Sequence, residues 1–518
     1  MKLGRISAWL VGALLFTNLI ACNSSKNNFT VEEDPNIEKN YIVNIEPEKE
    51  KLLRNPLSGW VLYGSPTLKN YWERYDTLKV PGLDQPIKIE DYAHTLYMRV
   101  SWTMLNPEED VYGWDTDENL KNVIEEARKR NMRLAFRVVV DSQDKPSNFT
   151  PQFVKDAGAE GFISKSGKRE VWSPYPDDPV FQEKYEKFIK AFAAKFNDPD
   201  VVDFLDGYGL GKWGEAHGVT YKDESNREAV LHWVTDLYSN YFTKIPLALN
   251  YHRLVGVSKS WEQPDPKSEA LLDEVFNKGY ILRHDAFGMS PYYEQWEKDY
   301  ASKWVTKEKG SGKRPIIMEG GWVTKQHRWD LHDPRGYKTL GDVRQGEFDD
   351  SKEARVNMMD FRINETESWF EESYDLVKEF ISEGGYRLYP DKISLPRKVI
   401  RGSEVTITHN WINLGWGFCP NNIPQWNYRY KVAFALLDKQ TGNVKQVYVD
   451  KNSEPSDWLK EEATFYNFKP IIDFPKGKYQ WAVALVDTSK DNAVGLEIAA
   501  KAPMLLSGWM PLMDVNIE

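Results

Sequence analysis

The residues best suited to chemistry stand together between Asp203 and Gly218. This stretch begins as a short hydrophobic strand and ends in a loop rich in glycine, which carries Trp213, Glu215 and His217. A carboxyl group can donate or accept a proton, and a flat aromatic ring can stack on the apolar face of a sugar. We therefore predict that Glu215 is one of two catalytic carboxylates acting on a carbohydrate, with Trp213 and His217 as substrate-binding neighbours.

Glu319 is the predicted second carboxylate. It ends a strand-like run, residues 315–319, and precedes two glycines and Trp322. Cleavage of a glycosidic bond needs one group that protonates the leaving oxygen and another that attacks the anomeric carbon or activates water. We assign these roles to Glu215 and Glu319, and expect apolar neighbours such as Trp213 to keep Glu215 protonated.

Strands and helices alternate from residue 52 to residue 385, which predicts a (β/α)8 TIM barrel as the catalytic domain. A doubly wound parallel sheet is the alternative, although no glycine-rich phosphate loop follows the first strand. The eight expected strands cover residues 61–64, 95–102, 133–140, 201–209, 245–250, 280–287, 315–319 and 358–363. The expected helices cover residues 117–131, 178–196, 228–242, 268–279, 347–357 and 367–381.

Active sites of such barrels lie at the carboxyl ends of the strands. Glu215 follows the fourth expected strand and Glu319 ends the seventh, so their carboxyl groups can converge across the mouth. Polar and aromatic residues at other strand ends are predicted to bind substrate; these are Arg99, Trp102, Arg137, Asp141, Asn250, His252, His284, Asp285 and Trp322. Each also has a plainer interpretation as a core or ion-paired residue.

After residue 385 the pattern changes to strand-like runs separated by turns. The runs cover residues 404–411, 430–437, 446–449, 479–486 and 502–510. This spacing predicts an antiparallel, immunoglobulin-like β-sandwich over residues 386–518. Exposed aromatic residues would favour a carbohydrate-binding role for it, and a large apolar contact with the barrel would favour a packing role.

The first 22 residues have the features of a bacterial lipoprotein signal peptide. A short basic start precedes an apolar segment that ends at Ala21 and Cys22. We expect lipidation of Cys22, a flexible tether over residues 23–51, and attachment to the bacterial cell envelope, at the outer membrane. An ordinary secretory peptide is the alternative. If Cys22 is lipidated, Cys419 is unpaired and no disulfide is expected.

Composition narrows the functional classes. A net charge of −11 argues against a general nucleic-acid binder, because phosphate binding depends on basic surface. Two distant cysteines exclude a cysteine-based zinc site. Glu215 and His217 could form a zinc-type pair, but no other histidine has a recognisable ligand spacing. We therefore expect no metal and no cofactor, with carbohydrate and the membrane as partners.

The layout resembles that of clan A glycoside hydrolases, which are retaining (β/α)8 barrels. The resemblance implies that Glu215 is the acid/base, that Glu319 is the nucleophile, and that Arg99, or else Arg137, orients the nucleophile. Two short motifs, Trp213-Gly214-Glu215 with His217 and Arg283-His284-Asp285, also resemble those of bacterial barrel-plus-sandwich lipoproteins.

Gly214 departs from the clan pattern, which has an asparagine directly before the acid/base. That asparagine binds the sugar 2-hydroxyl, so another residue must do this or the chemistry differs. A glycoside hydrolase is the first hypothesis. A non-catalytic surface lipoprotein that binds glycan is the second, and a scaffold that contacts envelope proteins through the sandwich is the third.

Overall fold

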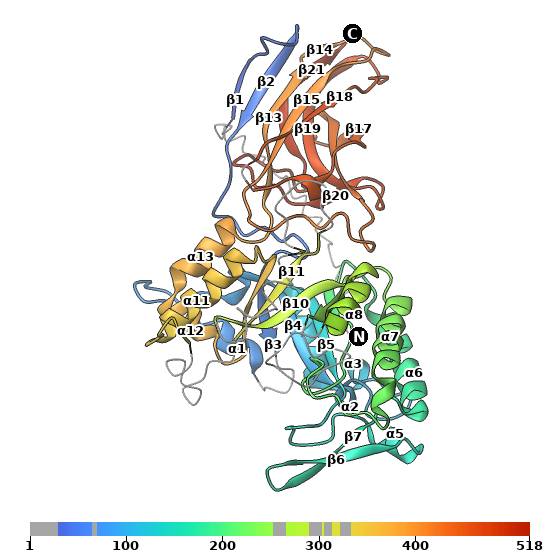
Figure 1. Ribbon diagram of the computed structural model, residues 1–518. Coiled ribbons are helices and arrows are strands. Elements are labelled where there is room, and N and C mark those ends of the chain that lie inside the picture. The colour runs from blue at the N-terminus through green and yellow to red at the C-terminus, as the bar shows by residue number, and fades with distance from the viewer. Residues whose placement is uncertain are drawn as a thin grey trace, which may run out of the picture.

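The computed structural model describes residues 29–64, 70–251, 266–289, 303–304, 313–321, 333–460 and 462–518. Their chain forms a barrel surrounded by helices and a second domain made of β-sheets, stacked end to end (Figure 1). The two domains share one cluster of buried apolar residues.

The barrel consists of eight parallel strands closed in sequence order. All eight expected strands are confirmed to within a few residues, and the doubly wound alternative is wrong because β12 pairs with β3. The strands are β3 (Gly59–Gly64), β4 (Ala93–Ser101), β5 (Arg133–Val139), β8 (Val202–Asp206), β9 (Leu247–Asn250), β10 (Ile281–Phe287), β11 (Ile316–Gly320) and β12 (Met358–Phe361).

Six longer helices follow barrel strands: α4 (Glu118–Lys129), α6 (Pro179–Phe196), α7 (Arg227–Tyr241), α8 (Pro266–Asn277), α11 (Leu340–Glu353) and α13 (Tyr374–Glu383). Helix α11 begins seven residues before the expected start, because Thr339 and Asp342 form a capping box there. The expected final helix is divided into α12 (Thr366–Glu372) and α13. Shorter pieces are α1 (Tyr71–Tyr75), α2 (Trp102–Leu105), α3 (Gly113–Thr116), α5 (Gln152–Asp156), η1 (Ile89–Asp91) and η2 (Glu224–Asn226).

Side chains of the barrel strands alternate between two layers, as the period of a β-strand requires. On β9, Leu247 and Leu249 pack with the outer helices, whereas Ala248 belongs to the interior. On β10, Leu282 is outer and Ile281 interior. Inward-facing positions can therefore be assigned by parity along each strand, and the polar ones gather at the carboxyl ends.

Two mainly antiparallel sheets form the second domain, and this confirms the predicted sandwich architecture. The ring of His409 in one sheet lies 5.3 Å from that of Phe434 in the other, within the core between them. One sheet has the order β1 (Phe29–Glu33), β2 (Asn40–Ile45), β13 (Leu388–Pro396), β15 (Ile407–Asn413), β18 (Thr464–Phe468). The other has β14 (Lys398–Val399), β21 (Met510–Ile517), β19 (Gly477–Asp487), β16 (Tyr430–Asp438), β17 (Val444–Asp450), with β20 (Ala493–Leu496) beside β19.

The prediction of a flexible tether over residues 23–51 is wrong for residues 29–45. They form the hairpin β1–β2, and β2 pairs with β13 through partners such as Val43 and Ile393. Val43 is fully buried, and the run Tyr41 to Ile45 has the β-branched residues that suit a strand. The sandwich therefore includes both ends of the described chain, and the barrel is inserted between β2 and β13. The expected strand at 502–510 is also misplaced, since β21 begins at Met510.

The sandwich covers the amino-terminal face of the barrel. The Asn357 amide, directly before β12, donates to the Leu57 and Phe418 carbonyls at 3.0 and 2.9 Å. The Tyr386 hydroxyl donates to the Pro56 carbonyl at 2.6 Å, and Lys313, before β11, donates to the Ser456 carbonyl. This buried contact favours the packing role for the sandwich, and it lies opposite the carboxyl ends of the strands.

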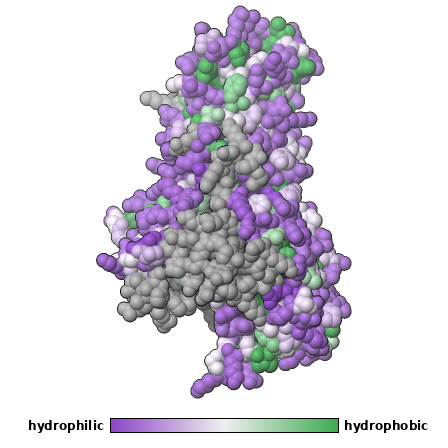
Figure 2. All heavy atoms as spheres, viewed as in Figure 1, coloured by the Kyte–Doolittle hydropathy of each residue, from purple (hydrophilic) through white to green (hydrophobic). Residues whose placement is uncertain are grey.

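On the face shown in Figure 2, the described surface is mostly hydrophilic, with hydrophobic residues in small separate groups. Within the described ranges, no helix has the length and apolar character needed to cross a membrane. Cys419 is buried and free, and Cys22 lies outside the described residues.

Removal of the hairpin β1–β2 should destabilise the protein. A chain beginning at Glu46 exposes the edge of β13 and loses the buried side chains of Val43 and Ile45, which together contribute about 3–5 kcal/mol. Urea unfolding of chains beginning at Phe29 and at Glu46 measures this difference. Val43→Ala should lower the free energy of unfolding by about 1–3 kcal/mol, whereas Glu33→Ala, at an exposed position, should leave it unchanged. Equal stability of the two chains would contradict the role given to the hairpin.

Candidate active site

Glu215 lies on a tightly wound loop after β8. Five residues within four positions of it have positive φ, namely Gly211 (74°), Trp213 (62°), Gly214 (75°), Ala216 (63°) and Gly218 (52°). Non-glycine residues rarely adopt this conformation, and where they do a functional site is a common reason. A Cβ atom at Gly214 would approach Arg137 Cδ to 3.2 Å. The asparagine of the clan pattern would therefore crowd Arg137 at this position, even though asparagine is one of the residues that tolerate positive φ.

Two arginines from neighbouring strands bind one oxygen of Glu215. Arg99 Nη2 on β4 donates to Glu215 Oε1 at 2.6 Å, and Arg137 Nη1 on β5 donates to the same oxygen. Arg99 and Arg137 are register partners, so both guanidinium groups enter the mouth at one level. The second oxygen, Oε2, lies 3.5 Å from His217 Nε2.

Glu319 is surrounded by guanidinium groups as well. Arg99 Nη2 donates to Glu319 Oε1 at 2.7 Å, and Arg283 Nη2 on β10 donates to Oε2 at 3.0 Å. Arg137 Nη2 and Arg362 Nε follow at 3.7 and 4.0 Å. The expectation that Arg99 orients Glu319 agrees with this geometry, and Arg137, the second choice, contacts both carboxylates.

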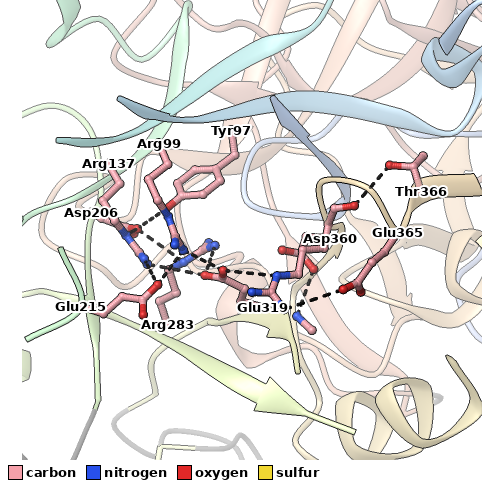
Figure 3. Close-up of polar contacts among 12 residues, drawn as sticks. Tyr97, Arg99, Arg137, Asp206, Glu215, Arg283, Glu319, Asp360, Glu365 and Thr366 are labelled. Atoms are coloured by element: carbon pink, nitrogen blue, oxygen red, sulfur yellow. Dashed lines mark hydrogen bonds and ion pairs between the residues drawn. The ribbon is translucent and has the colours of Figure 1, made fainter. Parts of the chain in front are cut away.

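The two carboxylates are close together. One nitrogen, Arg99 Nη2, lies 2.6 Å from Glu215 Oε1 and 2.7 Å from Glu319 Oε1. These oxygens therefore cannot be farther apart than the sum of the two distances, about 5.3 Å. Carboxyl groups of retaining glycosidases are about 5–5.5 Å apart, and those of inverting enzymes about 6.5–9.5 Å apart. Figure 3 shows both side chains pointing toward the same arginines.

Asp206 and Tyr97 support the arginines from inside the barrel. Asp206 Oδ2 accepts from Arg137 Nε at 2.6 Å and from the Tyr97 hydroxyl at 2.7 Å, and it lies 3.4 Å from Arg283 Nε. The Arg283 guanidinium also lies over the Tyr97 ring, 4.2 Å from its centroid. Arg137 and Arg283 are thereby fixed by contacts on several sides (Figure 3).

The protonation state of Glu215 differs from the one predicted from the sequence. Burial opposes ionisation of Glu215, but Arg99 and Arg137 outweigh it and hold the pKa of this carboxyl well below its usual range. Burial likewise opposes ionisation of Glu319, but Arg99 and Arg283 lower its pKa to about 2. The expectation that apolar neighbours keep Glu215 protonated is therefore wrong: Trp213 packs on His217, and guanidinium groups dominate the surroundings of Glu215.

Asp360, at the end of β12, is the protonated neighbour of the pair. Its Oδ1 accepts from the Gly320 amide at 3.1 Å. Burial, together with the charge of Glu319, raises the pKa of Asp360 to about 7. Behind it, burial raises the pKa of Glu347 to about 8, although Arg344 Nη1 donates to Glu347 Oε2. The mouth thus contains ionised carboxylates beside carboxyl groups that retain a proton near neutral pH.

Other predicted residues also reach the mouth. Asn250 ends β9 and faces inward by strand parity. His217 is buried beside Glu215, with Trp213 half-buried at the rim. His284 is buried with its ring 4.7 Å from that of Tyr251, and it lies near enough to His217 and Glu215 for their charges to act on it. Substrate contact by any of them stays a prediction.

Trp102 and Asp141 do not belong to the mouth. Trp102 has no exposed surface and packs in the outer layer against Tyr185 and Phe188 of α6, so it cannot stack on a sugar. Asp141 Oδ1 accepts from the Ser173 hydroxyl at 3.0 Å and thereby ties β5 to the hairpin of β6 (Gly161–Ser166) and β7 (Arg169–Pro174). Predicted site residues His252 and Trp322 lie outside the described residues.

Glu215, His217 and Asp285 are the one group of metal-ligating type found in the described part of the chain. They offer one ligand atom each, all within 4.8 Å of one another. Arg99 and Arg137 already bring two positive charges to Glu215, which opposes the entry of a further cation. The spacing alone assigns no metal.

Four residues of this network were not predicted as site residues from the sequence, namely Tyr97, Asp206, Arg283 and Asp360. Charged residues within the barrel strands were the signal that could have identified most of them. Arg99 stands two positions after Tyr97 on β4, so the two share a face. Asp206 ends β8, and Asp360 interrupts the otherwise apolar β12. The hairpin β6–β7 was also missed, although the turn Gly167–Lys168 between alternating residues predicts one.

Comparisons with known proteins add little to this geometry. No protein-family model matches the chain, and no curated protein is significantly similar in sequence. Solved structures that match include several glycoside hydrolases. A GH30 endoxylanase from Clostridium papyrosolvens C71 is 10% identical, with a TM-score of 0.34 over 83% of this chain and 97% of that chain. Endo-glycoceramidase II from Rhodococcus sp., in a lactosyl-enzyme intermediate, is 12% identical, with a TM-score of 0.37 over 79% and 98%.

An exo-β-1,4-mannosidase, Op5Man5 from Opitutaceae bacterium strain TAV5, is 12% identical to this chain, with a TM-score of 0.37. The match covers 65% of this chain and 62% of that chain. These identities and TM-scores are too low to transfer a residue role or an activity.

Asp360→Asn should remove a pH-dependent cost to stability. The folded-state pKa of Asp360 is raised from 3.8 to about 7, so wild-type stability falls as pH rises through this interval, by about 1.4 kcal/mol per pH unit at most. Asparagine can still accept from the Gly320 amide but does not titrate. Urea unfolding at pH 5 and pH 8 should therefore show a stability gain for the variant that is larger at pH 8. A gain that is the same at both pH values would contradict the buried, protonated state.

Proposed function

We propose that this protein is a glycoside hydrolase that cleaves an oligo- or polysaccharide with retention of anomeric configuration. The observation that carries the proposal is the shared contact of Glu215 and Glu319 with Arg99 Nη2 at the carboxyl ends of a closed barrel. The resulting oxygen separation of at most about 5.3 Å fits the double-displacement mechanism, in which the second carboxylate attacks carbon directly.

Glu319 is the nucleophile in this proposal. Because Arg99 and Arg283 keep it ionised, its oxygen is available to bond to the anomeric carbon while the bond from that carbon to the leaving oxygen breaks. Glu215 gives a proton to the leaving oxygen and then takes one from the water that displaces Glu319. The same arginines offset the charge on the carboxylates before and after each step.

The lowered pKa of Glu215 constrains this mechanism. A general acid works when protonated, and Arg99 and Arg137 favour its ionised form. Hydrolysis should therefore be fastest on the acidic side of neutrality for substrates whose leaving group needs a proton. Substrates with a leaving group of low pKa need no such proton and should escape the constraint in the first step.

The same observation favours a second candidate, a surface protein that binds glycan without cleaving it. Its support is the ionised pair together with Gly214 at the position of the clan asparagine. Binding of a glycan with no reducing-end product, in wild type and in a Glu319→Gln variant alike, would favour this candidate.

We further propose that the protein is anchored to the bacterial envelope through lipid on Cys22, with a carbohydrate as its partner at the site. The apolar segment before Ala21-Cys22 supports this. Strand β1 begins at Phe29, so at most the six residues 23–28 separate the lipidated residue from the folded sandwich.

Glu319→Gln should lower turnover of every glycoside by about 10⁴-fold or more, because glutamine cannot form the covalent intermediate. Glu215→Gln should lower it by about 10²–10⁴-fold on glycosides with poor leaving groups and little in the first step on 2,4-dinitrophenyl glycosides. Glu125→Gln, exposed on α4, is the control. A glycan library finds the substrate, and NMR of the first-formed product reads the anomeric configuration. Inverted product, or full activity of Glu319→Gln, would reject the mechanism.

Cys22→Ala should release the protein from membranes. Expressed in a bacterial host, the wild-type chain is expected to incorporate radioactive palmitate and to sediment with the membrane fraction, because several acyl chains on one residue exceed the threshold for stable anchoring. The variant should do neither. Membrane association that survives Cys22→Ala would show that another part of the chain is responsible.

A further inference from the structure

Asn250 and Arg283 stand side by side at the mouth. They are register partners on the parallel strands β9 and β10. Both share the parity of interior residues on their strands, Ala248 and Ile281, so both side chains face the barrel axis. Asn250 is 6% exposed and Arg283 is 1% exposed, comparable to Glu215 at 3% and Glu319 at 1%. A ligand that contacts Glu319 therefore also comes close to Arg283, which donates to that carboxylate.

The polar atoms of this pair are not fully used by the protein. Among the residues that the structure describes, Asn250 Oδ1, Asn250 Nδ2 and Arg283 Nη1 have no hydrogen-bond partner. Buried polar groups are almost always hydrogen-bonded, because leaving one unpaired away from water destabilises the folded protein. Together the three atoms offer donors from both residues and one acceptor. A hydroxyl group, which both donates and accepts, suits this set.

Charge selects between a neutral and an anionic ligand. Arg283 already contacts two acidic side chains, since its Nη2 donates to Glu319 at 3.0 Å and its Nε lies 3.4 Å from Asp206. Its single positive charge is therefore offset before any ligand arrives. A sugar carboxylate or sulfate at Arg283 would compete with Glu319 and Asp206 for the same guanidinium group, whereas a neutral hydroxyl needs only the donor at Nη1.

Because residue 214 is a glycine, it has no side chain that could bind the sugar hydroxyls as the asparagine of the clan pattern does. A side chain at this position would point to the alkyl part of Arg137 and the Val138 carbonyl. We propose that Asn250, together with Arg283 Nη1, forms the subsite that binds ring hydroxyls of the sugar next to the cleaved bond, and that this sugar is neutral. The inference rests on the proposed glycosidase function and replaces the missing asparagine with one from the next strand.

The Tyr97 ring makes the subsite rigid. It covers one face of the Arg283 guanidinium at 4.2 Å and is itself held by the bond from its hydroxyl to Asp206. The donor of Arg283 is thus fixed in direction, which favours one hydroxyl position on the ring over the others.

The test measures coupling between Asn250 and one hydroxyl. From a panel of 2,4-dinitrophenyl glucoside, galactoside, mannoside and xyloside, the best substrate is compared with its monodeoxy analogues and, where C6 exists, with its uronide. One deoxy analogue should lower kcat/KM of the wild type about 10- to 100-fold. With Asn250→Ala the same analogue should change kcat/KM less than about threefold, as a double-mutant cycle requires for a direct contact. The uronide should be the poorer substrate of the wild type.

Asn250→Ser, which keeps a short side chain able to donate and accept a hydrogen bond, is the second variant and should recover part of the discrimination. Thermal unfolding of both variants checks that each is folded. The inference is overturned if Asn250→Ala loses the same factor on every analogue, or if the uronide is preferred. Labelling of Glu319 by 2-deoxy-2-fluoroglycosyl fluorides, followed by mass spectrometry, tests the glycosidase function separately. If the wild type is labelled but shows no coupling to Asn250, only the proposed subsite is rejected. If the wild type is neither labelled nor active, the subsite and the glycosidase function are both rejected.

Discussion

The contact of one nitrogen, Arg99 Nη2, with both Glu215 and Glu319 is the constraint on which the mouth of the barrel depends. Carboxylates this close repel each other, and burial opposes the charge of each. They remain ionised because guanidinium groups from β4, β5 and β10 enclose them. Breaking a buried ion pair leaves an uncompensated charge and is strongly destabilising, so each member of the network fixes the others in place.

This network has requirements that extend beyond the two carboxylates. Arg137 needs Asp206 on one side and open space at Gly214 on the other. Asp206 in turn needs the Tyr97 hydroxyl. The strained loop after β8 follows from the same demand, because the carboxylate must approach arginines that project from β4 and β5. The shape of the loop after β8, the ionised state of Glu215 and Glu319, and the glycine at position 214 therefore all depend on the same arginine contacts.

The barrel could be predicted from sequence because buried parallel strands are nearly continuous apolar runs, as in Arg133 to Val139. Glu215 and Glu319 followed from strand counting. The protonation state could not, because it depends on Arg99, Arg137 and Arg283 meeting from distant strands. The hairpin β1–β2 could not be predicted because it precedes the barrel in the chain. Its partner β13 follows the barrel and lies about 350 residues after β2. The local sequence pattern around β2 does not indicate which distant strand it will pair with.

The insertion of the barrel between β2 and β13 has a consequence for biosynthesis. As the chain emerges, β1 and β2 appear first, but β2 finds its partner only after the whole barrel has been made. Contacts of such sequence separation form slowly, and an unpaired strand edge can pair with other chains meanwhile. The sandwich is therefore completed last, and its closure on the amino-terminal face of the barrel marks a chain that has been synthesised in full. A protein cut short before β13 would keep an open strand edge by which cellular quality control could recognise it.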